Sequence, residues 1–229
     1  MKIIATTRTK NEEGNVKDWI DSYLWADEVL VVDGGSSDKT QEIVQAHPHA
    51  TLITFQQRIA LPNGDFFNPQ GAQINAAYNG ARERGADWII FDDCDCFPNA
   101  EMKKRGREFF ETAERSSKLM IRAHRYFIEG NQFYPYMNEY GQSIWAFRAD
   151  TDTHASERDP KYHEIKGQPD ETRHLLLYPP NVLLHYALPT QEVFEKKLAF
   201  YTGLRGENKY HHPKHWAGTP SPLPEYAHR

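Results

Sequence analysis

The first hundred residues alternate between short apolar runs and segments with helical spacing, and this alternation constrains the fold more than any other feature. The apolar runs are residues 2–6, EVLVVDGG, TLITF and DWIIF. The first intervening segment places apolar side chains along one helical face, at Val16, Trp19, Ile20, Tyr23 and Leu24. A second helix carries Ile43 and Val44, and residues 69–84 form an alanine-rich third. The pattern predicts an α/β fold with a mostly parallel sheet flanked by helices.

Three loops follow the carboxyl ends of the predicted strands, at residues 7–11, 33–36 and 92–95. In open sheets of this kind, ligands bind beyond the carboxyl ends of the strands. We therefore expect these loops to converge on one crevice.

The second half of the chain has a mixed pattern. A predicted helix at 99–113 is followed by strand-like pieces, and a last helix is expected from Thr190. Aromatic side chains in FYPYMNEYGQSIW suit either stacking on a ligand or core packing. The tail contains His211, His212 and His215 without periodicity, and we assign it no metal site.

Composition and charge narrow the classes of function. The 229 residues carry a net charge of -5, which argues against a broadly basic nucleic-acid-binding surface and leaves a local basic groove open. The chain contains no run near the ~18 apolar residues of a membrane-spanning helix, and its charged start does not resemble a secretory signal. Cys94 and Cys96 lie too close in sequence for a structural disulfide. We expect a cytoplasmic protein.

The segment WIIFDDCDCFP brings three carboxylates together after an apolar strand. Crowded carboxylates raise one another's pKa unless a cation neutralises them, and oxygen ligands suit Mg²⁺ or Mn²⁺. Asp93 and Asp95 are therefore predicted metal ligands. The alternative is a solvated acidic turn.

The segment VVDGGSSDKT places a carboxylate at a strand end before small residues and a helix start. Asp33 is suited to accept hydrogen bonds from a base or ribose, and Gly35 lets a ligand approach the backbone. A plain turn capped by Ser36 or Ser37 explains the pattern as well.

Read together, TRTKNEEGNVKDWIDSYLWADEVLVVDGGSSDKTQEIV and the Asp93-Cys94-Asp95 triplet resemble the family 2 glycosyltransferases. The resemblance implies a GT-A fold, a strand-end Asp and a first loop that hold the donor nucleotide, and a metal-binding D-x-D. It extends over residues 1–204 and divides the chain into a nucleotide-sugar-binding half at 1–98, an acceptor and catalytic half at 99–205, and a tail at 206–229. The donor-binding residues it implies are Thr7, Arg8, Asn11, Glu12, Asp33, Gly35, Asn75, Asp93 and Arg148.

Downstream segments are similar to the branch that decorates lipopolysaccharide cores, in AFR at 146–148, YHE at 162–164, LLHY at 183–186 and FEKKLAFY at 194–201. This similarity implies Glu164, beside His163, as the base, with Glu139 and Asp150 as fallbacks. It also adds His185 to the metal ligands, although a hydrogen-bonded histidine at a strand end is an equal reading.

Two positions depart from the family pattern. Cys96 stands where Glu often follows the D-x-D, and Ile74-Asn75 lacks the basic member of an Arg-Asn pair. Replacement positive charge is available from Lys10, Arg58, Arg8 or Arg148.

The expected activity is inverting sugar transfer, assisted by Mn²⁺ or Mg²⁺, from a nucleotide-diphosphate sugar, with a UDP-sugar as the first expectation. The acceptor stays open among a glycan, a lipid-linked glycan at a membrane surface and a modified nucleobase. Rival interpretations are a haloacid-dehalogenase-like phosphatase, a nucleotidyltransferase and a non-catalytic nucleotide-sugar-binding module.

Overall fold

The computed structural model describes residues 1–61, 64, 66–129, 132–135, 142–158, 164–186 and 221–222. The chain forms two compact units that interleave along the sequence. The first unit comprises Met1–Cys94, Lys103–Arg122 and Ile144–Leu176, and the second comprises Asp95–Met102, Ala123–Ser143 and Leu177–Arg229.

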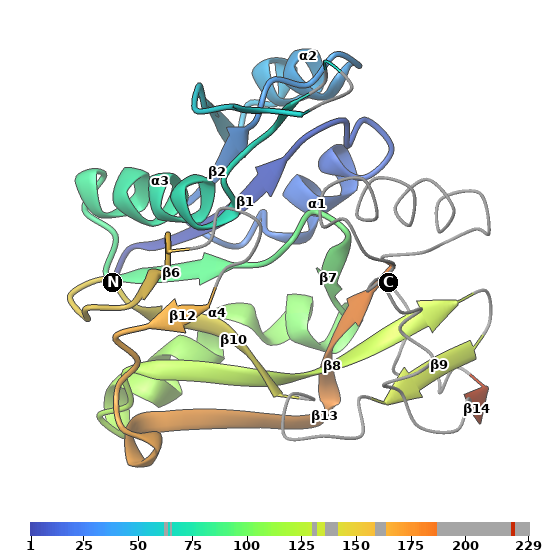
Figure 1. The fold of residues 1–229 in the computed structure, drawn as a ribbon. Coiled ribbons are helices and arrows are strands. Elements are labelled where there is room, and N and C mark those ends of the chain that lie inside the picture. Colours follow the sequence, from blue (N-terminus) through green and yellow to red (C-terminus); the bar gives the residue numbers. More distant parts are fainter. Residues whose placement is uncertain are drawn as a thin grey trace. The chain divides into compact units, whose positions relative to one another are not determined.

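The first unit is built on strands in the order β10-β6-β1-β2-β3 (Figure 1). Strands β6, β1, β2 and β3 run parallel to one another, and β10 pairs antiparallel with β6. The α/β fold with a mostly parallel sheet is therefore confirmed. The bounds of these strands are β1 Ile3–Thr9, β2 Glu28–Asp33, β3 Ala50–Thr54, β6 Trp88–Phe91 and β10 Gln142–Arg148.

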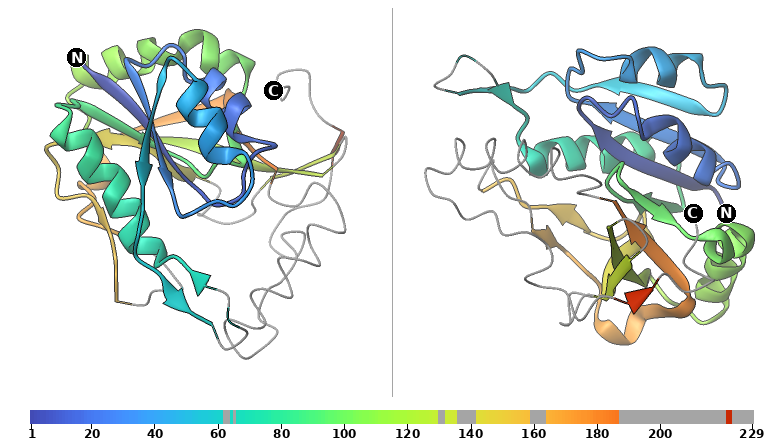
Figure 2. Two further views of the ribbon diagram at one scale, coloured as in Figure 1. Left: turned by 90° about the horizontal axis from the view of Figure 1, so that it is seen from above. Right: turned by 90° about the vertical axis from the view of Figure 1, so that its right-hand side faces the viewer.

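Helices connect the parallel strands, as the alternating pattern predicts. Helix α3 packs along β1 and β2, while α1 lies beside α2 (Figure 2). The helices are α1 Val16–Ser22, α2 Thr40–Ala46, α3 Gln70–Glu83 and α4 Ala100–Arg115. Two short antiparallel pairs, β4 with β5 and β11 with β12, and one 3-10 helix complete this unit. Their bounds are β4 Ile59–Ala60, β5 Phe66–Phe67, β11 His154–Ala155, β12 Ile165–Lys166 and Glu171–Arg173.

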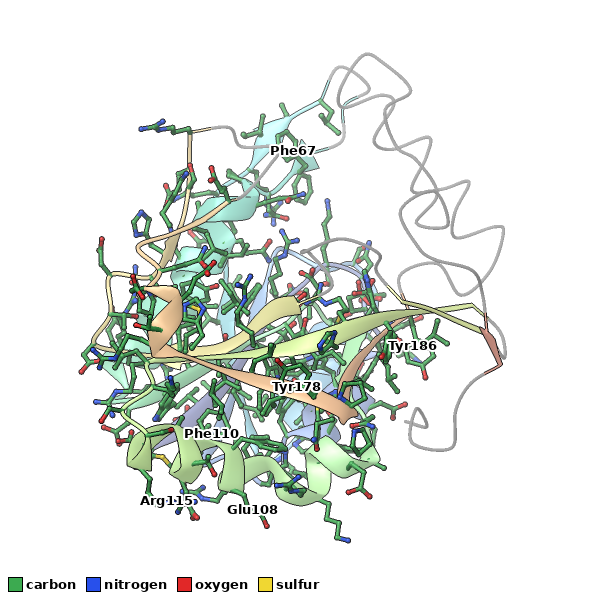
Figure 3. All side chains as sticks on the ribbon, turned by 90° about the horizontal axis from the view of Figure 1, so that it is seen from below. Phe67, Glu108, Phe110, Arg115, Tyr178 and Tyr186 are labelled. Atoms are coloured by element: carbon green, nitrogen blue, oxygen red, sulfur yellow. The ribbon has the colours of Figure 1, made fainter. Side chains whose placement is uncertain are left out.

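Alternation along β6 distributes side chains between two packed layers. Ile89 belongs to the core cluster that contains Tyr78 of α3, whereas the ring of Trp88 meets that of Phe110 on α4 with 5.4 Å between centroids. On α4, Phe110 is buried while Glu108 and Arg115 are exposed (Figure 3). Each fully buried side chain of this kind contributes about 1.5–3 kcal/mol of transfer free energy, so both layers stabilise the strands that carry the loops.

The second unit contains antiparallel strands. Strand β7 pairs with β13, and β9 pairs with β8 on one side and with β14 on the other. Ile128, Val182 and Leu184 form its buried cluster. The bounds are β7 Cys96–Pro98, β8 Met120–Glu129, β9 Gln132–Pro135, β13 His174–His185 and β14 Ser221–Pro222.

The predicted serine cap of the second helix is wrong. Helix α2 begins at Thr40 after Lys39, without a side-chain cap. Asp38 instead accepts the Thr40 N–H and hydroxyl, at 3.0 and 2.6 Å, and the Ser36 hydroxyl donates to Asp33. The Asp38 carboxylate, two residues before the first helical residue, thus accepts the Thr40 donors in place of a serine cap.

Several predictions concern parts of the chain that lie outside the described residues. These are the helix from Thr190, the tail from 206 apart from β14, Glu139 and His163. Among the residues that the structure does describe, none of the helices has the length and apolar character needed to cross a membrane.

Candidate functional site

Asp33, at the carboxyl end of β2, is buried and organises the loop that follows it. Its Oδ1 accepts the N–H groups of Gly35 and Ser36, both at 2.9 Å, and Nε2 of Gln41 at 2.7 Å. Its Oδ2 accepts the hydroxyls of Thr9, at 3.0 Å, and of Ser36. Charge-assisted bonds from three separate parts of the chain fix the shape of the loop. In this structure Asp33 therefore shapes the turn formed by residues 33–36, the glycine turn.

Gly35 is required by its conformation and by a close neighbour. Its φ of +85° lies in the left-handed region, and a Cβ there would lie 2.4 Å from Nη2 of Arg58. The Arg58 guanidinium carbon lies 4.2 Å from the centroid of the Phe66 ring, and Nζ of Lys10 lies 3.8 Å from the same centroid. Lys10 also donates to the Phe66 carbonyl at 2.8 Å. Two cations thus flank one ring next to the glycine turn.

The first loop is tied to the second. Asn11 donates its N–H to the Ser36 hydroxyl and accepts the Ser37 N–H at Oδ1, both at 2.8 Å. Glu12 donates its N–H to Thr40 Oγ1 at 2.8 Å. The structure brings these two predicted residues together with the Asp33 turn, as the convergence of strand ends requires.

Arg8 lies beside Asp93, with Nε donating to Oδ1 at 3.0 Å. The pairing of β1 with β6 sets Thr6 opposite Phe91, so Arg8 and Asp93 each follow two residues later at the same sheet edge. Their side chains are 19% and 35% exposed, which makes this a half-buried pair. Thr7, next to Arg8, is fully buried in β1.

Tyr78 of α3 lies near this pair. Burial raises the pKa of its phenol well above the usual value, and the negative charge of Asp93 raises it further while Arg8 lowers it. Its ring packs edge-on against Phe91 and Phe147. Tyr78 therefore stays neutral at physiological pH.

Asp95, Cys96 and His185 of the second unit bring together side-chain atoms of the kinds that bind metal ions. Strand β7 sets Cys96 opposite His185 of β13, and Nε2 of His185 lies 3.4 Å from Oδ1 of Asp95. One ligand atom from each residue lies within 4.8 Å of the other two. The Tyr186 N–H donates to the Asp95 carbonyl at 2.8 Å and holds the two segments together. The structure thus joins two predicted ligands, Asp95 and His185, and adds a thiol.

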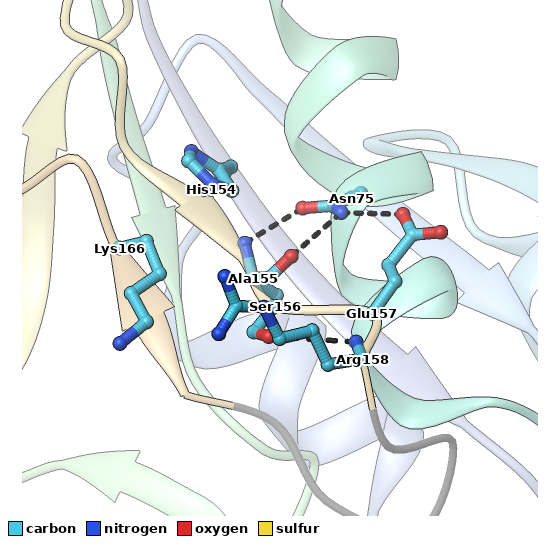
Figure 4. Close-up of a pocket in the computed structure, with 7 residues that line it drawn as sticks. All are labelled: Asn75, His154, Ala155, Ser156, Glu157, Arg158 and Lys166. Carbon is cyan, nitrogen blue, oxygen red and sulfur yellow. Dashed lines mark hydrogen bonds between the residues drawn. The ribbon is translucent and has the colours of Figure 1, made fainter.

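Asn75 is engaged in holding β11. Its Nδ2 donates to the Ala155 carbonyl at 2.9 Å and to Glu157 at 2.6 Å, and its Oδ1 accepts the Ala155 N–H at 2.7 Å. These residues line a cavity of about 370 Å³ together with Arg158 and Lys166 (Figure 4). The hydrogen bonds of Asn75 therefore connect α3 to β11 in this structure.

Arg148, a predicted donor-binding residue, is the last residue of β10. Arg148 pairs with Trp88, the first residue of β6, because β10 runs antiparallel to β6. It therefore lies at the opposite end of β6 from Asp93. Its guanidinium pairs with Glu114 at 2.6 Å and with Asp150 at 3.2 Å. The antiparallel direction of β10 sets this position, and the donor contact of Arg148 stays a prediction.

Glu164 is exposed, and its Oε1 lies 2.5 Å from Nζ of Lys166. Its carbonyl accepts the Ser156 N–H at 2.8 Å. The fallback base Asp150 is exposed and pairs with Arg148. The role of Glu164 as the catalytic base therefore stays a prediction.

The sequence does not predict the positions of Cys96 and Arg58 in the site. Cys96 was recognised only as a departure from the family pattern, and Arg58 only as one of four sources of positive charge. The signal for Cys96 was its place directly after Asp95 on a strand, and the signal for Arg58 was Phe66 nearby in the chain. Neither signal reveals that Cys96 lies opposite His185 or that Arg58 lies beside Gly35, because these contacts join distant segments of the chain.

The model of the family described as "Glycosyl transferase family 2" matches residues 7–167. The solved structure of S. aureus TarS residues 1–349, described as a complex with UDP-GlcNAc, has a TM-score of 0.55 and 17% identity, over 90% of this chain and 65% of that one. The structure of S. aureus TarS has a TM-score of 0.54 and 15% identity, over 87% of this chain and 39% of that one. These likenesses confirm the predicted GT-A fold.

Among curated proteins, an uncharacterized protein of Mycobacterium tuberculosis and one of Mycobacterium bovis are each 29% identical over 106 residues. The match covers 46% of this chain and 26% of each relative. The chain therefore spans about a quarter of the length of these relatives.

Proposed function

The chain belongs to glycosyl transferase family 2, and from this premise we propose that it transfers a sugar from a nucleotide-diphosphate sugar to an acceptor hydroxyl. The proposal includes a divalent cation, inversion of the anomeric centre and action in the cytoplasm. Residues of the loops after β1 and β2 are proposed to bind the nucleotide, and aspartates of the D-x-D with His185 are proposed to bind the cation.

One observation carries the proposal: the ends of β1 and β2 form a rigid turn with cations beside it. Asp33 holds the turn, and Gly35 leaves room for the Arg58 guanidinium to lie against it. A nucleoside diphosphate carries several negative charges, and guanidinium and ammonium groups recognise them by charge-assisted hydrogen bonds. Lys10 and Arg58 thus supply the positive charge that the family's Arg-Asn pair supplies elsewhere.

The cation is proposed to bind to Asp95 and His185, with Asp93 as a further predicted ligand. Carboxylate oxygen and imidazole nitrogen suit Mn²⁺, and Mg²⁺ takes the carboxylate more readily than the imidazole. Bound there, such an ion supplies charge neutralisation for the leaving diphosphate. The donor set of this chain fits a divalent ion for this reason.

Transfer with inversion needs one residue to take the acceptor's proton as the hydroxyl oxygen attacks the anomeric carbon. We retain Glu164 as that base, with His163 next to it in the sequence. The side chain of Glu164 is exposed and its ion pair with Lys166 lies at the surface, so it is accessible to an incoming acceptor.

A uridine nucleotide is the first donor to test, since the S. aureus TarS fragment is described in complexes with UDP-GlcNAc and with UDP. The acceptor is proposed to be a glycan, with lipid-linked glycans at a membrane surface and modified nucleobases as further classes. Similarity of residues 146–201 to the lipopolysaccharide-core branch favours the glycan.

The test is a panel of nucleotide sugars with and without Mn²⁺, read as thermal stabilisation and then as product formation. A ligand at a hundred times its Kd stabilises the folded state by about 2.7 kcal/mol, which a melting curve resolves. We expect one nucleotide sugar to stabilise the protein more with Mn²⁺ than without it, and to yield a glycoside. Stabilisation without any product would favour a binding module, and metal-dependent release of phosphate from a phosphomonoester would favour a phosphatase.

A further inference from the structure

Cys96 occupies a position that its neighbours make chemically specific. It is fully buried in β7, and directly opposed residues of an antiparallel pair project from the same face of the two strands. The residue opposite it is His185, and the residue before it is Asp95. A sulfur, a nitrogen and an oxygen are thereby gathered within 4.8 Å of one another.

This spacing matches the coordination sphere of one ion. Protein ligands bind an ion such as Zn²⁺ at about 2.0–2.3 Å, so two ligands of the same ion lie at most about 4.6 Å apart. The limit of 4.8 Å between the three atoms in this structure is close to that separation. The alternative role of Cys96, as a small apolar residue that fills space, predicts no effect on metal binding.

We propose that the Cys96 thiolate is a protein ligand beside Asp95 and His185, and that it makes the site selective for borderline transition-metal ions over Mg²⁺. This inference rests on the proposed function for the role of the ion, and it specifies which ion the chain takes. Thiolate and imidazole suit Zn²⁺ and Co²⁺, whereas Mg²⁺ demands oxygen ligands in octahedral geometry. On binding, the thiol releases its proton to solvent and the sulfur donates an electron pair to the ion.

The experiment is a titration of the full chain with Co²⁺, followed by absorption in the near ultraviolet, where thiolate-to-cobalt charge transfer is seen. The chain has 2 cysteines, so the Cys94→Ser variant leaves Cys96 as its single thiol. We expect the band in the unmodified protein and in Cys94→Ser. Absence of the band from Cys94→Ser would overturn the proposal, and this arm does not depend on a folded Cys96→Ser protein.

Cys96→Ser is expected to lack the band and to bind Co²⁺ at least about tenfold more weakly, since even residues that only support metal ligands have effects of that size. Mg²⁺ in large excess should leave the band in place. Displacement of Co²⁺ by Mg²⁺ at comparable concentration would contradict the selectivity.

The result also separates this inference from the proposed function. A charge-transfer band in a protein that transfers no sugar from any nucleotide donor would retain Cys96 as a ligand and remove the transferase proposal. Sugar transfer with Mg²⁺ and no charge-transfer band would retain the transferase and remove Cys96 from the site.

Discussion

Arg8 and Asp93 form an ion pair at the adjacent carboxyl ends of β1 and β6, with Nε of the arginine 3.0 Å from Oδ1 of the aspartate. The first carboxylate of the D-x-D therefore already has a cationic partner within the protein. The second, Asp95, lies near an imidazole and a thiol. Two aspartates separated by one residue thus have different electrostatic surroundings, and we expect them to respond differently to substitution.

Asp95→Asn should lower the affinity for Mn²⁺ at least about tenfold, because it removes a charged oxygen from the ligand group. Asp93→Asn should have a smaller effect on Mn²⁺, because Arg8 already offsets that charge. Its effect on folding stability should be at most about 1 kcal/mol, as for other partly exposed ion pairs. Calorimetric titration with Mn²⁺ measures both variants, and equal losses of affinity would contradict this difference.

Gly35→Ala should destabilise the protein and also weaken nucleotide binding. The left-handed backbone costs an alanine about 1–2 kcal/mol, and the added methyl must displace Arg58. Gly85→Ala is the matched control, since Gly85 has a φ of +72° and no heavy atom within 4 Å of the added Cβ. Urea unfolding should show both variants destabilised, while only Gly35→Ala loses affinity for the nucleotide sugar. Equal affinities for the nucleotide sugar in the two variants would mean that the position of Arg58 does not affect nucleotide binding.

The sequence predicted the parts of the fold that depend on local pattern. Strands β1, β2 and β6 and helix α3 follow from apolar spacing, and the grouping of Asn11 and Glu12 with the Asp33 turn follows from the meeting of parallel strand ends. The cap of α2 could not be predicted this way. Ser36, Asp38 and Thr40 all carry oxygens that could serve as a cap, and the tertiary structure gives each a different partner.

Features that depend on the pairing of distant segments were beyond prediction from local pattern. Arg148 lies at the end of β6 opposite Asp93 because β10 is antiparallel, a direction that the sequence of β10 does not specify. Cys96 and His185 are 89 positions apart in the sequence. They lie side by side only because β7 pairs with β13. Sequence patterns of period two reveal a strand and leave its partner unspecified.

Arg58→Ala should reduce the affinity for nucleoside diphosphates about tenfold, the loss expected for one charge-assisted hydrogen bond of about 1.5–3 kcal/mol after partial compensation by water. The dependence of binding on salt should also decrease. Arg105→Ala provides the control, because Arg105 lies over the Phe109 ring on α4, 5.0 Å from its centroid, and is unconnected with the glycine turn. Titration with UDP at two salt concentrations measures both effects. Unchanged UDP affinity in Arg58→Ala would exclude Arg58 from phosphate recognition.

Glu164→Gln should abolish sugar transfer and leave donor binding nearly intact, because an amide cannot accept the acceptor's proton while its size is conserved. Glu157→Gln is a useful comparison, since Glu157 is exposed on the nearby β11 segment and its carboxylate accepts a hydrogen bond from Asn75. Transfer rates under saturating donor, together with donor Kd values, separate chemistry from binding. Normal turnover in Glu164→Gln would remove this residue from the mechanism.

Tyr78→Phe should make folding stability less sensitive to alkaline pH. Burial raises the pKa of Tyr78 in the folded state above its unfolded value, so its contribution to stability is complete below about pH 10 and is lost progressively as the pH rises above that value. The unfolded chain loses the phenolic proton first, which lowers the free energy of unfolding by up to about 1.4 kcal/mol per pH unit. Urea unfolding at neutral pH and near pH ~11 should therefore show a shallower decline in Tyr78→Phe. Tyr178→Phe is the control, because Tyr178 is 61% exposed and its removal should leave the decline unchanged. A decline as steep in Tyr78→Phe as in the unmodified protein would mean that other groups determine the alkaline limit.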